Sequence, residues 1–301
     1  MSQTPPKKLI VYGITGLLGS RIWQLCSPRF KIIGPPHTLL NLADFKRVKE
    51  HINDTLPDRI IYVAGLTKVD EAEKNPKLAY KLNFEIPAKI ASFAKKKRIP
   101  LLYVSTDAIF DGRKYDRAYT ERDKPNPISV YGKSKLAGEQ AIVSASATNL
   151  ILRTIMLYSA NYPHKKDFAR TAYESLKNHQ TFTAIADQII NPTFVDDFVN
   201  AMTAAIEKNA RGIYHVAAID HTTNLGFVKK IAKIFNFNKN LITKTYFDEF
   251  FQNKPAPRTK YCRLDTTKFQ KQFKGILKST EQSLAEFKKQ IESVESEPIS
   301  L

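Results

Sequence analysis

The sequence of 301 residues is poor in the side chains that build disulfide frameworks and metal centres. Its two cysteines, Cys26 and Cys262, are far apart, and its six histidines form no HxxxH or HExxH pattern. These counts exclude a disulfide-stabilised secreted domain and give no zinc-site spacing, so we expect no metal. The first apolar run is too short for a signal peptide or a membrane span, so we expect a cytoplasmic protein with no membrane span.

An excess of acidic residues is also missing. The chain has 47 Lys and Arg against 29 Asp and Glu, which gives a formal net charge of +18. Such a charge attracts nucleic acid, anionic lipid or anionic small substrates. The lysines are spread along the chain, however, and the densest run, residues 95–98, is typical of a helix C-terminus. We therefore expect no nucleic-acid partner, whereas a nucleotide-bearing substrate would benefit from the positive field.

A glycine turn near the start of the chain predicts a dinucleotide site. Residues 8–12 predict a buried strand, and the turn at 13–19 has the spacing GxxGxxG and leads into a helical pattern. In this context the helix N-terminus faces the pyrophosphate of the dinucleotide. We expect Gly13 to allow the tight turn, Gly16 to let the backbone approach the phosphates, and Gly19 to allow close helix packing. The alternative is a plain tight turn into a helix.

The next strand, expected at residues 30–33, is followed by Gly-Pro-Pro-His and by no acid. An acid at this place often binds the adenosine ribose, so selectivity for NAD is unsupported and both NADPH and NADH stay open. We expect Asn41 and Leu42 to lie near the adenine. Further strands are expected around residues 59–63, 100–107 and 149–153.

Strands that alternate with helices predict an α/β protein with a Rossmann-type doubly wound parallel sheet and a smaller C-terminal substrate-binding lobe. The hydrophobic content of 43% fits a globular chain with a sizeable core. The expected boundaries are a NAD(P)-binding Rossmann domain at 1–160, to which 191–217 returns, a substrate-binding lobe at 161–190 and 218–291, and a polar tail at 292–301.

Tyr131 and Lys135 are four residues apart in a stretch expected to be helical, so they share one face. A lysine ammonium near a phenol lowers the tyrosine pKa toward neutrality, and such a pair can move a proton. An exposed tyrosine above a solvated lysine has the same spacing. Thr106 ends the strand expected at 100–107, at the edge of an open parallel sheet where ligands bind. Its alternative role is to cap the loop that follows.

Together these patterns resemble the extended short-chain dehydrogenase/reductases, and within them most closely the RmlD-like (dTDP-4-dehydrorhamnose reductase) family. The matching stretches run nearly from end to end. They are residues 13–19, 67–73, 83 with 87, 105–112, 119–127, 131–135 with 138–139, 152–154, 157–158, 192–193, 212–215 and 258–265.

The resemblance implies an NAD(P)H-dependent nucleotide-sugar oxidoreductase of dTDP-rhamnose and cell-surface polysaccharide synthesis. Hydride would pass from the nicotinamide to the C4 ketone of a nucleotide-linked 4-keto-6-deoxysugar. Tyr131 would protonate the developing alkoxide as general acid, and Thr106 would hydrogen-bond the same oxygen. Lys135 would hold the nicotinamide ribose and tune Tyr131.

The remaining site residues fall into two groups, besides the catalytic Thr106, Tyr131 and Lys135. The cofactor, NADPH or NADH, is expected to contact Gly13, Thr15, Gly16, Leu17, Leu18, Gly19, Asn41, Leu42, Ala64, Gly65, Leu66, Asn83, Val104, Ser105, Tyr131 and Lys135. The substrate is expected to contact Thr67, Val69, Thr106, Asp107, Ala108, Met156 and Arg258.

The substrate pocket departs from the family pattern at three places. Ala108 stands where the family has an aromatic residue, Ile155 and Met156 replace a Ser-Trp pair whose tryptophan contacts the sugar, and Ser159 replaces a glycine. The nucleotide sugar is therefore left open between the rhamnose precursor and a related deoxysugar.

Two other functions stay open. A regulatory subunit, like the β subunit of methionine adenosyltransferase, shares the pattern and also lacks the tryptophan, yet has no physical need for the proton-transfer pair. An epimerase or dehydratase usually adds an acid pair beside the strand-end threonine, whereas Asp107 is a single acid here. A homodimer is also left open.

Overall fold

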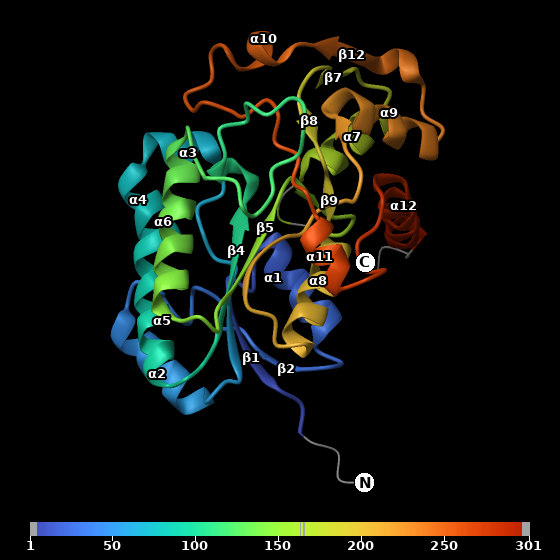
Figure 1. Ribbon diagram of the computed structural model, residues 1–301. Helices are drawn as coiled ribbons and strands as arrows, with labels where there is room; N and C mark the ends of the chain where they lie inside the picture. The colour runs from blue at the N-terminus through green and yellow to red at the C-terminus, as the bar shows by residue number, and fades with distance from the viewer. Residues whose placement is uncertain (1–4, 163, 165, 297–301) are drawn as a thin grey trace. The chain divides into compact units, whose positions relative to one another are not determined.

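The structure, a computed structural model, describes residues 5–162, 164 and 166–296 (Figure 1). It divides into two compact units. The first comprises Met1–Phe110, Lys124–Arg153 and Met202–Tyr214, and the second Asp111–Asp123, Thr154–Ala201 and His215–Leu301.

These boundaries differ from the expected ones in three segments, of which residues 154–160, expected in the Rossmann domain, lie in the second unit. Residues 111–123, expected within the Rossmann domain, belong to the second unit because they pair with its chain: Tyr261 N donates to Gly112 O at 3.1 Å, and Tyr119 N to Arg263 O at 2.9 Å. Of the returning segment 191–217, only residues 202–214 lie in the first unit.

A six-stranded sheet forms the centre of the first unit, in the order β10-β5-β4-β3-β1-β2. Parallel pairing joins β1 to β2 and β3, and β3 to β4. The strands are β1 (Lys8–Tyr12), β2 (Lys31–Ile33), β3 (Arg59–Tyr62), β4 (Leu101–Thr106), β5 (Leu150–Thr154) and β10 (Gly212–His215). The strand order reverses between β1 and β3, and ligands of open α/β sheets bind outside the carboxyl ends of the strands at such a switch point.

Helices connect these strands, and α2, α5 and α6 lie together beside the sheet (Figure 1). The helices of this part are α1 (Leu17–Cys26), α2 (Phe45–Thr55), α3 (Val69–Lys74), α4 (Pro76–Tyr80), the π-helix η1 (Lys81–Glu85), α5 (Ile86–Lys96), the 3₁₀-helix η2 (Asp107–Ile109), α6 (Val130–Ala145) and α8 (Val195–Glu207), whose last six residues belong to the first unit.

One face of the sheet is covered by an apolar core. Alternate residues of β1, β3 and β4 point into it, and they meet apolar side chains of α2, α5 and α6. The sheet contributes Ile10, Tyr12, Ile60, Tyr62, Leu101 and Tyr103, and the helices contribute Val48, Ile52, Ile86, Ile90, Ala91, Ala94 and Ile142, all of which are buried. Burial of these side chains fixes the register of the strands, and with it the positions of their carboxyl ends.

The helical run of α4 and α5 is interrupted by the π-helix η1. Pro87 has no N–H group, so it cannot bond the carbonyl of Asn83, four residues earlier. The Tyr103 hydroxyl donates to this carbonyl oxygen instead, at 2.7 Å. Proline thereby frees a backbone acceptor, and a strand residue of the core satisfies it.

The second unit is built from short strands and helices around an aromatic core of Tyr158, Tyr173, Phe194, Phe227 and Phe287. In it β6 pairs in parallel with β9, β12 in parallel with β7, and β11 antiparallel with β8. Its elements are β6 (Leu157–Tyr158), α7 (Phe168–Lys177), β7 (Phe182–Ile185), β8 (Ile189–Ile190), β9 (Thr193–Phe194), β11 (Thr222–Thr223), α9 (Asn224–Ile234), the 3₁₀-helix η3 (Lys239–Leu241), β12 (Ile242–Thr245), α10 (Phe247–Phe251), α11 (Thr267–Gln272) and α12 (Thr280–Ser296).

We expected the polar tail to begin at residue 292, and this predicted start is too early. Helix α12 continues to Ser296, and the buried Leu284, Phe287 and Ile291 anchor it in the aromatic core. Residues 297–301 of the predicted tail lie outside the described residues. Within the described part of the chain, no helix is long and apolar enough to cross a membrane.

Candidate active site

The glycine turn between β1 and α1 has the geometry that a phosphate site needs. Gly13 has φ +100°, and a Cβ atom there would lie 2.5 Å from the backbone nitrogen of Ala64. A Cβ on Gly19 would lie 2.1 Å from the carbonyl oxygen of Gly13. Gly16 precedes α1 without a side-chain cap, and the first turn of α1 contains no acid. The N-terminus of α1 therefore keeps backbone N–H groups for an anion.

The other residues of this turn, Thr15, Leu17 and Leu18, lie at the same helix start, with Thr15 exposed and Leu18 buried. Beyond β2, Asn41 Oδ1 accepts a hydrogen bond from Ala43 N at 2.9 Å. Leu42 follows it, and α2 then begins at Phe45.

Asn83 is fully buried. Its Oδ1 accepts from Leu66 N at 3.0 Å, and its Nδ2 donates to Leu66 O at 3.2 Å and to Ser134 Oγ at 2.9 Å. Both amide protons are used, so Asn83 holds the loop Ala64–Gly65–Leu66 against α6, and its contact with the cofactor stays a prediction. The loop, with Thr67 exposed and Val69 at the start of α3, lies at the carboxyl end of β3.

The start of α6 is fixed by caps and by a close backbone contact. Ser129 Oγ accepts from Gly132 N at 3.1 Å, and Glu73 Oε2 accepts from Val130 N at 2.9 Å. A Cβ on Gly132 would lie only 2.0 Å from the carbonyl oxygen of Ala108, so glycine lets η2 touch the helix. Because Ala108 and Gly132 are in contact, Thr106 and Tyr131 are brought together.

The Thr106 hydroxyl connects Tyr131 with Asp107. It lies beside Tyr131, donates to Asp107 Oδ1 at 2.9 Å and accepts from Ala108 N at 3.2 Å. Thr106 is buried, and Tyr131 and Asp107 are partly exposed. Two hydroxyl groups therefore lie together at the carboxyl end of β4, where one substrate oxygen can bond both.

Tyr131 is a protonated phenol at neutral pH. Burial raises its pKa to about 12, the neighbouring Thr106 hydroxyl opposes the rise, and the charge of Asp107 adds to it. We expected Lys135 to lower this pKa, and that expectation is wrong for the protein as it stands. The ammonium is engaged elsewhere, since Lys135 Nζ donates to the carbonyl oxygen of Val104 at 2.6 Å and lies 4.0 Å from the centre of the Tyr103 ring.

Lys135 itself is a perturbed group. It is 6% exposed, and burial lowers its pKa to about 7, while the carboxylate of Glu139 acts in the opposite direction. Perturbed groups of this kind gather at functional sites. Lys135 therefore loses its charge in the physiological pH range. The charges of the neighbouring groups set the pH at which this happens.

Ser105 gives an independent sign of a ligand. Its hydroxyl is buried at the end of β4, and in the described part of the chain it has no hydrogen-bond partner. A buried hydroxyl without a partner is costly unless something bonds it. Together with the glycine turn at the end of β1, Ser105 fits a dinucleotide that runs along the carboxyl edge of the sheet.

The expected substrate residues Met156 and Arg258 belong to the second unit, so their part in the site stays a prediction. Met156 has φ +43°, a left-handed conformation that is uncommon for a residue with a side chain. Its carbonyl oxygen accepts from Thr193 N at 3.1 Å. Arg258 donates to Ala256 O at 2.8 Å and lies 5.5 Å from the centre of the Phe251 ring.

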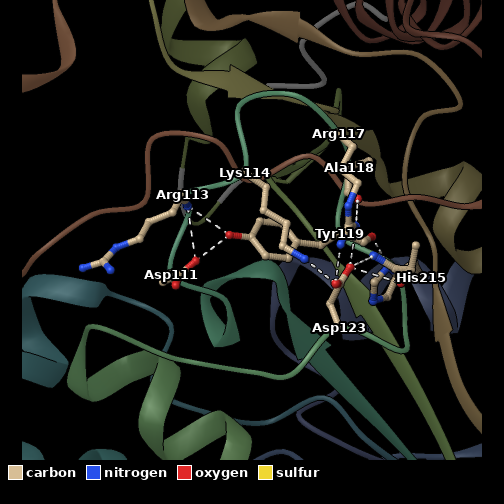
Figure 2. A network of polar contacts seen from close by, with 9 residues as sticks. Asp111, Arg113, Lys114, Arg117, Ala118, Tyr119, Asp123 and His215 are labelled. Atoms are coloured by element: carbon tan, nitrogen blue, oxygen red, sulfur yellow. Dashed lines mark hydrogen bonds and ion pairs between the residues drawn. The ribbon is translucent and has the colours of Figure 1, made fainter.

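The segment 111–123 is held by a polar network that the sequence analysis did not predict (Figure 2). Asp123 bonds Lys114, and it accepts from Arg117 at 2.7 and 2.8 Å and from Thr120 N at 2.8 Å. Arg117 holds the pKa of Asp123 well below its usual range. Tyr119, also in the network, donates to Asp111 Oδ1 at 2.6 Å. Asp111 and Asp123 therefore hold the conformation of the loop at residues 111–123.

Two residues of the matched stretches also gain a role that the sequence analysis did not assign. Glu139 and Arg153 form a buried ion pair one turn beyond Lys135. The sequence feature that could have indicated this role is the acid Glu139, four residues after Lys135. Among the described residues, no group of three or more His, Cys, Asp or Glu side chains could hold a metal ion.

Residues 7–293 match the family described as the RmlD substrate binding domain. The chain is 31% identical over 281 residues to a dTDP-4-dehydrorhamnose reductase of Salmonella typhimurium, covering 89% of this chain and 93% of that protein. The structure of a dTDP-4-dehydrorhamnose reductase from Bacillus anthracis in complex with NADP has 30% identity and a TM-score of 0.86, covering 94% of this chain and 99% of that one. A dTDP-4-dehydrorhamnose reductase structure from Clostridium acetobutylicum has 27% identity and a TM-score of 0.87, covering 95% and 99%.

The likeness to these two structures confirms the predicted Rossmann-type fold. The family match extends over nearly the whole chain, and it agrees with the motifs from the glycine turn to Arg258. The chain therefore belongs to the RmlD substrate binding domain family, among the extended short-chain dehydrogenase/reductases.

Proposed function

We propose that this protein is an NADPH- or NADH-dependent reductase that acts on the C4 ketone of a nucleotide-linked 4-keto-6-deoxysugar. The observation that carries the proposal is the placement of Thr106 beside Tyr131, set by the close contact of Ala108 with Gly132, with Lys135 one turn along the same helix. These groups lie at the carboxyl end of β4, in a sheet whose first turn has the geometry that a phosphate site needs. The related enzymes named above support the same reaction.

The chain's own residues supply the cofactor site. Gly13, Gly16 and the free start of α1 would hold the pyrophosphate, and the unpartnered Ser105 hydroxyl would bond the nicotinamide end. Lys135 would hold the nicotinamide ribose. A reduced nicotinamide, when bound there, supplies the hydride. Selection between NADPH and NADH stays open, because no acid follows β2.

Tyr131 delivers the proton. With a pKa of about 12 it carries its proton at neutral pH, as a general acid must in the reductive direction. Thr106 donates its hydroxyl proton to the substrate oxygen on which negative charge develops, which stabilises the transition state more than the ketone. Lys135 acts through the cofactor, since its ammonium bonds the Val104 carbonyl oxygen and would hold the nicotinamide ribose.

Substrate contacts from Thr67, Val69, Asp107, Ala108, Met156 and Arg258 are part of the proposal. Ala108 and Met156 offer smaller or more flexible surfaces than the aromatic residues of the family pattern. We therefore propose a keto-sugar of the dTDP-4-dehydrorhamnose class, with a pocket that tolerates related deoxysugars. The regulatory function gains no support from the structure, because a binding subunit has no use for Tyr131 placed beside Thr106.

The test is a direct assay. The purified chain is mixed with NADPH or NADH and a panel of dTDP-4-keto-6-deoxysugars, and absorbance of the reduced nicotinamide is followed. The proposal expects oxidation with at least one keto-sugar. Tight cofactor binding by calorimetry without oxidation by any member of the panel would favour the regulatory function instead.

A further inference from the structure

Glu139 of α6 and Arg153 of β5 form a buried ion pair. Arg153 Nε donates to Glu139 Oε1 at 2.9 Å and to Oε2 at 3.2 Å, and Nη2 donates to Oε2 at 2.7 Å. Both side chains are 3% exposed. The Arg153 guanidinium also lies 5.4 Å from the centre of the Phe110 ring. The carboxylate is therefore held in one place by a fork of donors.

Stability alone gives a weak reason for such a pair. Removing two charges from water costs several kcal/mol per ion in general, and apolar residues of the same volume often serve a fold as well. The position of the pair is more informative. Tyr131, Lys135 and Glu139 follow one another at four-residue spacing, so they lie on one face of α6. The carboxylate is thus one turn from the lysine of the proposed catalytic group.

The groups that bond Lys135 or act on its charge belong to β4 and α6 in the described part of the chain. Strand β4 supplies the Val104 carbonyl, which accepts from Nζ, and the face of the Tyr103 ring. Helix α6 supplies Tyr131 on one side and Glu139 on the other. Among the described residues, Glu139 is the carboxylate whose charge opposes the effect of burial on Lys135. Tyr103 and Tyr131 stay neutral at physiological pH because burial raises their pKa values.

We propose that Glu139, fixed by Arg153, is a positioning residue that keeps Lys135 charged during the reaction. Arg153 has a second effect, since its own positive charge limits the attraction that Glu139 exerts on the ammonium. The pair thus sets the pH at which Lys135 changes charge. The consequence for turnover rests on the proposed reductase function, whereas the effect on Lys135 does not.

The direction of each change follows from the charges. Glu139→Gln removes the attraction and leaves Arg153 uncompensated, so Lys135 should lose its proton at a lower pH than in the wild type. Glu139→Gln with Arg153→Met removes both charges. Glu139 lies one turn from Lys135 on α6, whereas Arg153 lies on β5, so we expect the Glu139 charge to have the larger effect. The double variant should therefore fall between the wild type and the single variant. Glu139→Asp keeps the charge and should stay closest to the wild type.

The test is an NMR titration of the lysine ammonium groups in the cofactor-free protein, with ¹⁵N-labelled lysine. Lys135→Met identifies the Lys135 signal by its loss. We expect Glu139→Gln to shift the midpoint of Lys135 downward by about one pH unit. Equal midpoints in the wild type and Glu139→Gln would overturn the proposal. If the single variant does not fold, the charge-balanced double variant decides, and a midpoint equal to that of the wild type is again the contrary result.

A second readout uses the enzyme. If the chain is a reductase, activity should fall on the alkaline side as Lys135 loses its charge, and this limb should move to lower pH in the order wild type, double variant, single variant. A purely structural pair would lower activity at every pH without moving the limb, which would count against the proposal. If no keto-sugar is reduced, the proposed function fails while the titration still decides the role of Glu139.

Discussion

The ammonium of Lys135 donates a 2.6 Å hydrogen bond to the carbonyl oxygen of Val104, and this bond joins helix α6 to strand β4. The two residues that follow Val104 are Ser105, with its unpartnered hydroxyl, and Thr106, which lies beside Tyr131. Lys135 therefore fixes α6, the helix that carries the proposed proton donor, to the end of this strand. Burial of the Lys135 charge lowers the stability of the fold, but it also places the ammonium where the reaction can use it.

Replacing Lys135 with Met should separate these two effects. The pKa of Lys135 is lower in the folded chain than in the unfolded chain, so the unfolded state binds more protons between about pH 7 and 10. The cost of burying the charge is fully present below pH 7 and disappears as the pH rises to the unfolded pKa. Lys135→Met should therefore be more stable than the wild type at pH 7, and this advantage should shrink toward pH 10.

The same variant should be nearly inactive. Loss of the ammonium should lower kcat/KM by about 10²-fold or more and weaken cofactor binding. Thermal unfolding across pH, kinetics and calorimetry on one preparation check both effects. A variant that loses stability at pH 7 would contradict the account of the buried charge.

Gly132→Ala tests the contact that brings Thr106 to Tyr131. The added Cβ would lie 2.0 Å from the Ala108 carbonyl oxygen, a backbone atom that cannot move alone. We expect a loss of about 1–3 kcal/mol in the free energy of unfolding and a larger proportional loss of kcat. Lys133→Ala, at the exposed neighbouring position, is the matched control and should change neither. Urea unfolding and initial rates measure the two effects, and a Gly132→Ala enzyme with wild-type kcat would refute this role.

Asp123→Asn tests the network that holds residues 111–123. The pKa of this carboxyl is depressed in the folded chain, so its contribution to stability is present above the unfolded pKa of about 4 and is lost only as the pH falls below it. The variant should lower thermal stability at pH 7 and expose residues 111–123 to limited proteolysis. The exposed Asp116→Asn is the control. Similar digestion of Asp123→Asn and the control would show that the network does not hold the loop.

The sequence predicted those parts of the site that depend on local geometry. Gly13 and Gly19 are needed by the turn itself, and four-residue spacing placed Tyr131 above Lys135 on α6. Thr106 was found because parallel strands end at a common edge. These features require only a strand, a turn and a helix, each of which has a pattern in the sequence.

What the sequence did not show depends on contacts between distant segments. The hydrogen bonds of the Asn83 amide to Leu66 and Ser134 have no pattern in the sequence. The pKa of Tyr131 was expected to fall because Lys135 is near in sequence, whereas burial raises it and the lysine bonds Val104. Burial and the choice among acceptors depend on the whole fold, and spacing along one helix does not contain them.

The central claim is that Tyr131 delivers the proton while other residues bind the cofactor. The most direct measurement compares the wild type with Tyr131→Phe, using NADPH and NADH oxidation with a dTDP-4-keto-6-deoxysugar and calorimetry of cofactor binding. We predict a loss of about 10³-fold or more in kcat, with a cofactor Kd within about threefold of the wild-type value. A Tyr131→Phe enzyme that turns over the keto-sugar at the wild-type rate would contradict the account.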